Sequence, residues 1–236
     1  MEVNSPIKNR ALISGGNSGI GLAIAKKFVA NNIPTAVADL DTGTFSDDNL
    51  RFFKCDVTSG ADIAMLFGAL HDKDELPNIL VCNAGQGIHE KLTEGDPEKW
   101  LKIIEVNLLG ALRLIRAFVP PMLKAGSGDV VIISSAAAGR SYEYGGVYSA
   151  TKSALETIAN TLRIEVQPSV RVTVVAPGVT DTNFFKNAIS GSHTIEDIGW
   201  GAISPTEVAD NVFYAVSRPP EVSINYLSIR PVLQPF

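Results

Sequence analysis

The sequence predicts an α/β fold: a doubly wound parallel sheet of about seven strands with helices on both faces, a three-layer sandwich. Short apolar runs of strand length alternate along the whole chain with longer segments of helical spacing. Residues 79–82 and 130–133 are apolar at every position, which is typical of strands buried on both faces of a parallel sheet. A glycine-rich turn follows the first strand and favours a Rossmann arrangement, which binds a dinucleotide.

The first half of the chain contains four predicted strands separated by two helices. The strands are residues 11–13, 35–38, 50–55 and 79–82, and the helices are 20–30 and 63–70. Residues 40–49 connect the second and third strands, and their Asp, Thr, Gly and Ser content predicts a loop in place of the usual crossover helix.

The second half continues the alternation. A helix is predicted at 97–119, ended by Pro120-Pro121, and another at 148–166, ended near Pro168. Strands are predicted at 130–133, 170–176 and 222–229. The Ser204-Pro205 start predicts a last helix that ends at residue 216.

Composition excludes several classes of protein. The chain has 236 residues, 45% of them hydrophobic, and no repeat or linker, so we expect a single domain over residues 1–236. The net charge is −5 and no window is basic, so no nucleic-acid partner is expected. Two cysteines, Cys55 and Cys82, are too few for a disulfide scaffold, and no metal site is expected because they lack nearby partners.

The same composition predicts a cytoplasmic location. The longest stretch without a charged residue, 76–89, is too short and too polar to span a membrane. The first ten residues lack the apolar segment of a signal peptide. We therefore expect no membrane partner.

The turn between the first strand and the first helix has the sequence Ser14-Gly15-Gly16-Asn17-Ser18-Gly19-Ile20-Gly21. Glycines permit a tight turn and a close approach of the backbone, while the helix N-terminus offers unpaired N–H groups to a pyrophosphate. The turn predicts cofactor contacts from Gly15, Asn17, Ser18, Gly19 and Ile20. The alternative is a tight strand-to-helix connection without a ligand.

Asp39 ends the second strand, where a carboxylate can accept hydrogen bonds from both ribose hydroxyls of an adenosine. The same carboxylate repels a 2′-phosphate, and the chain has Ser18, Leu40 and Asp41 where an NADP site would place Arg or Lys. These residues predict NAD as the cofactor in preference to NADP. The alternative is that Asp39 only caps the following turn.

Two further short motifs follow strands at the same end of the sheet. Asp56-Val57 follows the third strand, where Asp56 can bind an adenine amino group or, alternatively, cap the helix that begins near residue 59. Asn83-Ala84-Gly85 follows the fourth strand. There, small residues let a ligand pass, and Asn83 can bind the neighbouring loop backbone.

Ser135, Tyr148 and Lys152 are the predicted chemical group. Tyr148 and Lys152 are four residues apart on one helix and therefore share a face. An ammonium beside a phenol lowers the pKa of the phenol, so Tyr148 is a candidate proton donor or acceptor. Such a pair is usually a solvated helix face, but the small apolar residues that surround this one favour a pocket. Ser135 follows the fifth strand and can bind a substrate oxygen.

Together, these segments resemble the short-chain dehydrogenase/reductase family over nearly the whole chain. The motifs that match are the turn 14–21, Asp56-Val57, residues 82–85, Val106-Asn107-Leu108, the group Ser135, Tyr148 and Lys152, and Pro177-Gly178 with Thr182. The chain departs from the family pattern at Cys82, at Thr180 and in the short connection after Asp39. The segment 225–231 with Gln234 resembles the branch that includes 3-hydroxy acid dehydrogenases.

The resemblance implies an NAD(P)-dependent oxidoreductase that interconverts an alcohol, of the secondary alcohol or hydroxy acid class, and its ketone or aldehyde. It implies that Asn107 positions a water beside Lys152, and that Pro177, Gly178, Val179 and Thr182 hold the nicotinamide carboxamide. Two alternatives stay open: a silent NAD-binding regulatory or scaffold protein, and an epimerase that uses transient oxidation.

Residues 182–203 are predicted to be a long substrate-binding loop without secondary structure. Its aromatic residues either line a pocket or pack the loop onto the body. The predicted substrate contacts are Ser135, Tyr142, Tyr148, Phe184 and Phe185, with His89, Tyr144, His193 and Trp200 as further pocket candidates. The apolar surface of the helices 97–119 and 148–166 predicts a homodimer or homotetramer.

Overall fold

The computed structural model describes residues 9–191 and 194–235. Seven parallel strands form one sheet in the order β3-β2-β1-β4-β5-β6-β7. Their bounds are β1 Ala11–Ser14, β2 Thr35–Asp39, β3 Leu50–Lys54, β4 Ile79–Cys82, β5 Gly128–Ile133, β6 Val170–Pro177 and β7 Tyr226–Ile229. The strand order reverses between β1 and β4, which is where doubly wound sheets bind ligands. The predicted fold class is confirmed.

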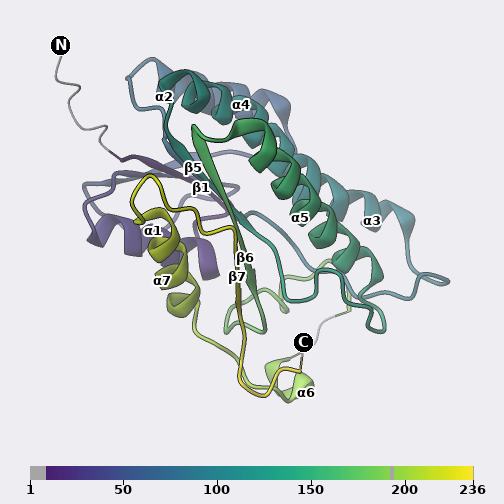
Figure 1. The fold of residues 1–236 in the computed structure, drawn as a ribbon. Helices are drawn as coiled ribbons and strands as arrows, with labels where there is room; N and C mark the ends of the chain where they lie inside the picture. The colour runs from purple at the N-terminus through teal and green to yellow at the C-terminus, as the bar shows by residue number, and fades with distance from the viewer. Residues whose placement is uncertain (1–8, 192–193, 236) are drawn as a thin grey trace, which may run out of the picture.

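Helices cover both faces of the sheet (Figure 1). One face carries α1 (Gly19–Ala30) and α7 (Pro205–Val216), which pack over Ile13, Val37 and Val81. The other carries α2 (Gly60–His71), α4 (Gly110–Ala125) and α5 (Gly146–Val166), which pack over Leu12 and Leu80. Successive side chains of a strand point to opposite faces, so each buried strand supplies both apolar layers. No helix lies between β2 and β3, as predicted for residues 40–49.

The prediction of one continuous helix over residues 97–119 is wrong in two respects: the helix ends later, and a π-helix interrupts it. It consists of α3 (Pro97–Ile104), the π-helix η1 (Glu105–Leu109) and α4, and it runs through Pro120 and Pro121. Proline costs a helix one hydrogen bond, but the last turn buries Met122 in the core. Gly126, at φ 72°, closes the turn by donating to the carbonyls of Leu123 and Met122. Tertiary packing therefore outweighs the local signal.

Two other predicted boundaries differ. The strand predicted at 222–229 begins at Tyr226, because the guanidinium of Arg171 binds the carbonyls of Arg218, Pro219 and Val222 and holds that segment as a loop. The loop that was predicted to bind substrate, residues 182–203, contains one short helix, α6 (Ile195–Ile198), where the prediction had none. A reciprocal pair of hydrogen bonds between Thr194 and Asp197 caps this helix.

Candidate active site

A cleft of about 650 Å³ opens at the carboxyl ends of the strands, where the strand order reverses. It collects predicted site residues from every part of the chain. Those that line it are Gly15, Ser18, Gly19, Ile20, Asp39, Asp56, Val57, Asn83, Ala84, Gly85, Ser135, Tyr142, Tyr148, Lys152, Pro177, Gly178, Val179, Thr182, Phe184 and Phe185. Asn17 and Asn107 are not among the lining residues, but both bind residues that are: the Asn17 N–H donates to the Asp39 carboxylate, and the Asn107 side chain binds the backbone of Gln86.

The glycine turn is shaped for a ligand that approaches its backbone closely. Gly15 and Gly19 have backbone φ angles of 66° and 51°, which residues with a Cβ atom rarely adopt. A Cβ on Gly21 would lie 2.1 Å from the carbonyl oxygen of Gly15. Ser18 begins α1 without a side-chain cap, so the first N–H groups of the helix have no capping acceptor. This geometry fits a dinucleotide pyrophosphate.

Neighbouring strands hold the turn in place. The side-chain amide of Asn83 donates to the carbonyls of Ser14 (3.0 Å) and Gly15 (2.9 Å), as the sequence predicted. In return, the Ser14 hydroxyl accepts from the backbone N–H groups of Asn83 and Ala84. Residues almost 70 positions apart thus form one rigid edge of the cleft.

Two carboxylates lie at the far end of the cleft. Asp39 accepts from the backbone N–H of Asn17 (2.9 Å) and of Leu40 (2.8 Å), so it orders the glycine turn as well as lining the cleft. Asp56 accepts from the backbone and hydroxyl of Thr58. The alternative in which Asp56 caps the next helix is wrong, because Ser59 caps α2.

Ser135, Tyr148 and Lys152 meet at the opposite end. Tyr148 and Lys152 are 8% and 4% exposed, and the Lys152 Nζ lies 5.9 Å from the centre of the Tyr148 ring. The Nζ donates to the carbonyl of Ile133 at 2.9 Å. Tyr148 and Ser135 hydrogen-bond through their side chains. The triad therefore lies on the cleft wall, with the ammonium of Lys152 over the ring of Tyr148.

Burial controls the protonation of Tyr148 and Lys152. It raises the pKa of Tyr148 to about 12, although the hydrogen bond with Ser135 opposes the shift. Burial also lowers the pKa of Lys152 to about 8. The sequence predicted a lowered pKa for Tyr148, and this is wrong. Loss of water around the phenol raises its pKa by more than the hydrogen bond with Ser135 lowers it.

Asn107 supports the Tyr148 end of the cleft from the π-helix η1. It is 1% exposed; its side chain accepts from the Gln86 N–H (2.8 Å) and donates to the Gln86 carbonyl (3.0 Å) and the Thr151 hydroxyl (3.1 Å). A Cβ built on Gly85 would lie 3.1 Å from Asn107 Oδ1 and 3.5 Å from Lys152 Nζ, so these two groups flank the same glycine. Single-turn π-helices are frequent at functional sites.

Comparison with known proteins identifies the family. The family model for short chain dehydrogenases matches residues 9–192. The chain belongs to the short-chain dehydrogenase family. An uncharacterised oxidoreductase of Staphylococcus saprophyticus is 31% identical, over 94% of this chain and 97% of its own length. The family resemblance seen in the sequence is confirmed, and the protein is an oxidoreductase of this family.

Solved structures of similar proteins include complexes with NADP and with a derivative of it. The closed form of a serine dehydrogenase with NADP+ has a TM-score of 0.89 at 27% identity, over 96% of both chains. An alcohol dehydrogenase of Thermococcus sibiricus with 5-hydroxy-NADP has a TM-score of 0.83 at 27% identity, over 96% of this chain and 97% of its own. These similarities support nicotinamide cofactors for such folds and do not support the preference for NAD.

Aromatic side chains close the cleft above the triad of this short-chain dehydrogenase. The rings of Phe184 and Tyr148 lie 5.7 Å apart, and Phe185 packs edge-on to Phe184 at the same distance. Tyr142 lines the wall beside them, with its ring 6.2 Å from that of His89. Phe184 and Phe185 thus place an apolar surface against the phenol of Tyr148.

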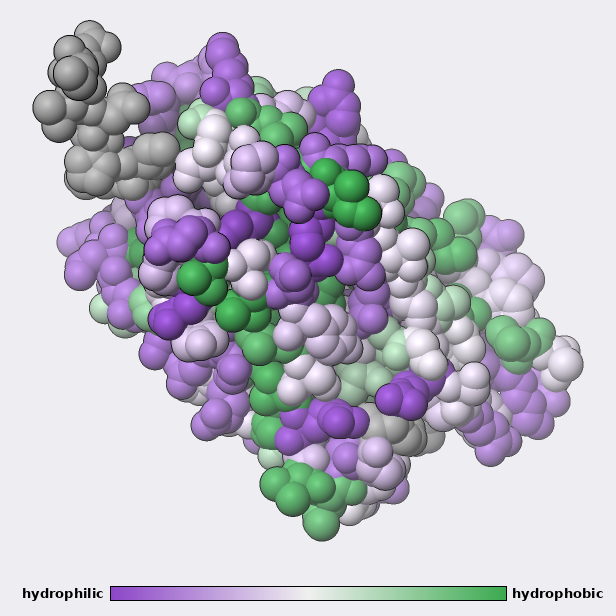
Figure 2. Space-filling view, viewed as in Figure 1, coloured by the Kyte–Doolittle hydropathy of each residue, from purple (hydrophilic) through white to green (hydrophobic). Residues whose placement is uncertain are grey.

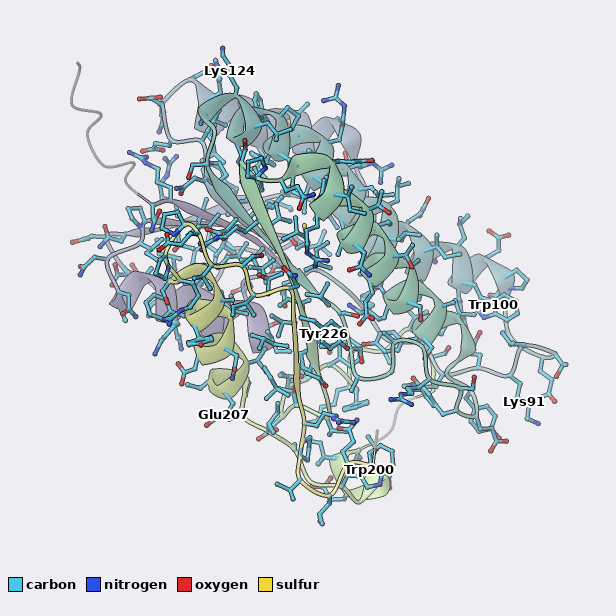
Figure 3. The ribbon with its side chains drawn as sticks, in the orientation of Figure 1. Lys91, Trp100, Lys124, Trp200, Glu207 and Tyr226 are labelled. Atoms are coloured by element: carbon cyan, nitrogen blue, oxygen red, sulfur yellow. The ribbon has the colours of Figure 1, made fainter. Side chains whose placement is uncertain are left out.

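Of the further residues predicted to line the pocket, some do and others do not. His89 and Trp200 line the cleft, and Figure 3 shows Trp200 beside α6 at the lower end of the molecule. Tyr144 is exposed and does not line it. His193 lies outside the described residues.

Sequence reasoning missed several lining residues, among them Gln86, Glu143, Asn187 and Asp197, and it assigned no contact to Gln234. The side chain of Gln234 accepts from the Val179 N–H at 3.0 Å, at the edge of the cleft. The segment after the last strand carries no local signal for such a contact. Only the return of β7 beside β6 brings Gln234 to this edge.

Within residues 9–191 and 194–235, no helix is long and apolar enough to cross a membrane. The same ranges hold no group of three or more His, Cys, Asp or Glu that is placed to bind a metal. Cys55 and Cys82 are buried free thiols whose pKa values burial raises. We assign them no chemistry.

Proposed function

We propose that this oxidoreductase interconverts an alcohol and its ketone or aldehyde by hydride transfer with a nicotinamide dinucleotide. The observation that carries the proposal is the convergence of Ser135, Tyr148 and Lys152 in one cleft with the glycine turn at the start of α1. The bound cofactor would accept or donate the hydride. Side chains of this protein would exchange the proton, orient the substrate oxygen and stabilise its charge.

Tyr148 exchanges the proton of the substrate oxygen in this proposal. Ser135, which hydrogen-bonds the phenol, orients that oxygen and stabilises the negative charge that develops on it. Lys152 holds the ribose next to the nicotinamide and favours the phenolate. Asn107 positions a water that connects Lys152 to solvent.

The protonation of Tyr148 predicts how the rate depends on pH. Because burial raises its pKa to about 12, the phenol holds its proton at neutral pH and can donate it to a carbonyl. Oxidation of an alcohol needs the phenolate, so its rate rises with pH, whereas carbonyl reduction slows as the proton is lost. A pH–rate profile measured in both directions tests this opposition.

We propose NAD as the preferred cofactor. Lys152 is the only lysine or arginine among the described residues that line the cleft, and it lies at the catalytic end. Asp39 and Asp56 line the far end, where a 2′-phosphate would meet negative charge without a guanidinium to balance it. Titration calorimetry with NADH and NADPH tests the proposal, and a preference for NADPH would overturn it.

The lining also favours neutral secondary alcohols over hydroxy acids. Tyr142, Phe184 and Phe185 offer apolar surface beside Tyr148. A substrate carboxylate is usually bound by arginine, which is missing from the described lining. A screen of alcohols and hydroxy acids, read as NADH formation, names the class. Tyr148→Phe is its control, because it removes the proton donor and keeps the ring. Turnover by Tyr148→Phe at the parent rate would disprove the assignment.

We propose self-association through the helices on the α5 side of the sheet. Their outer surfaces expose Leu101 (51%), Ile104 (41%) and Ile164 (72%). Figure 2 shows apolar residues that reach the surface over this side of the molecule. Large apolar side chains left in water on α3 and α5, which pack against each other, favour burial against a second copy of the chain. Light scattering after size exclusion gives the mass that tests this proposal.

A further inference from the structure

Glu90 lies outside the catalytic group but connects three segments that surround it. It belongs to the loop between β4 and α3, and its side chain is only 12% exposed. The Ser190 hydroxyl donates to Glu90 Oε1 at 2.5 Å, and this serine lies in the substrate loop, one hundred positions further along the chain. Glu90 thus forms a direct link from the body of the protein to that loop.

The other contacts of Glu90 fix its carboxylate to α3. The indole N–H of Trp100 donates to Oε2 at 2.9 Å, and the backbone N–H of Asp96 donates to the same oxygen at 3.1 Å. The Lys99 ammonium lies 3.3 Å from Oε1. Figure 3 shows Trp100 on α3, close to the loop that carries Lys91. These four donors hold the pKa of Glu90 below its usual range, with Ser190 the largest contributor.

Backbone contacts continue the link on both sides of Ser190. The His89 N–H donates to the carbonyl of Ser190 at 3.1 Å, and the Ile189 N–H donates to the carbonyl of Gly87 at 2.9 Å. Gly191 has a φ of 67°, and a Cβ there would lie 2.3 Å from the carbonyl oxygen of His89. The two segments therefore pack with no space for a side chain between them.

The anchored loop segment reaches the catalytic group. Ile189 and Phe184 pack against a small core that contains Ile88, Ile103 and Tyr148. The Phe184 ring lies 5.7 Å from the ring of Tyr148. Releasing Ser190 would therefore loosen the apolar surface that faces the reacting atoms.

We infer that Glu90 is a positioning residue that anchors the first part of the substrate loop, residues 182–191, so that Phe184 stays against Tyr148. The anchoring stands on the contacts above, and its effect on substrate affinity rests on the proposed function. A carboxylate is suited to this role because it accepts from four donors at once, and hydrogen bonds to a charged acceptor are stronger than those to a neutral one. An amide would present N–H groups either to the Trp100 and Asp96 donors or to the Lys99 ammonium, none of which can accept a hydrogen bond.

The first test measures the loop without any substrate. Lys186 is exposed in the anchored segment, so trypsin cleavage after Lys186, followed by mass spectrometry, reports its release. Glu90→Gln and Ser190→Ala are expected to speed this cleavage about tenfold, the factor that corresponds to one lost hydrogen bond to a charged group. Glu94→Gln is the matched control. Glu94 lies in the same loop, but it is 67% exposed and forms a surface ion pair with Lys91.

The second test uses turnover. Loosening the loop raises KM for the alcohol or ketone about tenfold in both variants, while the Kd for NADH stays at the parent value. If cleavage at Lys186 keeps the parent rate in both Glu90→Gln and Ser190→Ala, the anchoring is wrong. Faster cleavage with an unchanged KM would confine Glu90 to loop structure and overturn its role at the site. Absence of turnover in the parent protein would count against the proposed function alone, because the trypsin result does not depend on it.

Discussion

Replacing Lys152 by methionine tests whether the buried ammonium lowers the stability of the folded protein. Lys152 is 4% exposed, and burial lowers its pKa from 10.5 to about 8. Lowering a pKa by one corresponds to about 1.4 kcal/mol, so the charged form costs the folded state about 3 kcal/mol at pH 7. Methionine matches the length of the side chain without its charge.

The expected gain is smaller than this cost. The Lys152 Nζ donates to the carbonyl of Ile133, and losing this hydrogen bond costs about 1 kcal/mol. Lys152→Met is therefore more stable than the parent by about 2 kcal/mol at pH 7. Between pH 8 and 10.5 the unfolded lysine binds more protons than the folded one, so the parent gains stability as the pH rises. The advantage of the variant shrinks to near zero by pH 10.

Urea unfolding of both proteins at pH 7 and at pH 10 measures this difference. The buried cysteines and tyrosines titrate in both proteins, so their contributions cancel to first order. Lys124→Met replaces an exposed lysine and serves as the control, with no expected change of the difference between the two pH values. If Lys152→Met is less stable than the parent at pH 7, or if the difference does not depend on pH, the reasoning fails.

Two further substitutions test the supports of the site. Asn107→Ala leaves the N–H and carbonyl of Gln86 without their partner, so we expect a loss of about 1–3 kcal/mol in unfolding free energy, measured by denaturant. A loss below half a kilocalorie would argue against this support. Gly21→Ala forces a Cβ to within 2.1 Å of the Gly15 carbonyl oxygen, so we expect NADH binding to weaken at least tenfold in calorimetry. Gly68→Ala has open space around it in α2 and is expected to bind NADH like the parent, with about 1 kcal/mol more stability; equal binding by both variants would refute the role of the turn.

Local patterns were sufficient wherever one short segment carried its own signal. The predicted strand at residues 79–82 matches β4, because a continuous apolar run between turn signals requires no knowledge of its neighbours. The start of α7 was predicted in the same way, from the capping residue Ser204 and from Pro205 at the first helical position. The glycine turn was recognisable because its conformation restricts the residues that can occupy it.

Local patterns failed where distant packing decides the outcome. Pro120 and Pro121 predict a helix end, yet the helix continues because Met122 is buried in a core built from other segments. The π-helix that presents Asn107 has no sequence signal that we could use. The sequence gives no signal for the contact between Glu90 and Ser190, since the two residues lie one hundred positions apart.

The order of the motifs alone determined that this chain folds as a doubly wound sheet and belongs to an oxidoreductase family, because each motif depends on residues that are neighbours in sequence. Only the tertiary structure decided the electrostatics at Tyr148, where loss of solvent raises the pKa that the spacing to Lys152 predicted to fall. Solvent exclusion is a property of the whole assembled cleft. No spacing within a single helix can encode it.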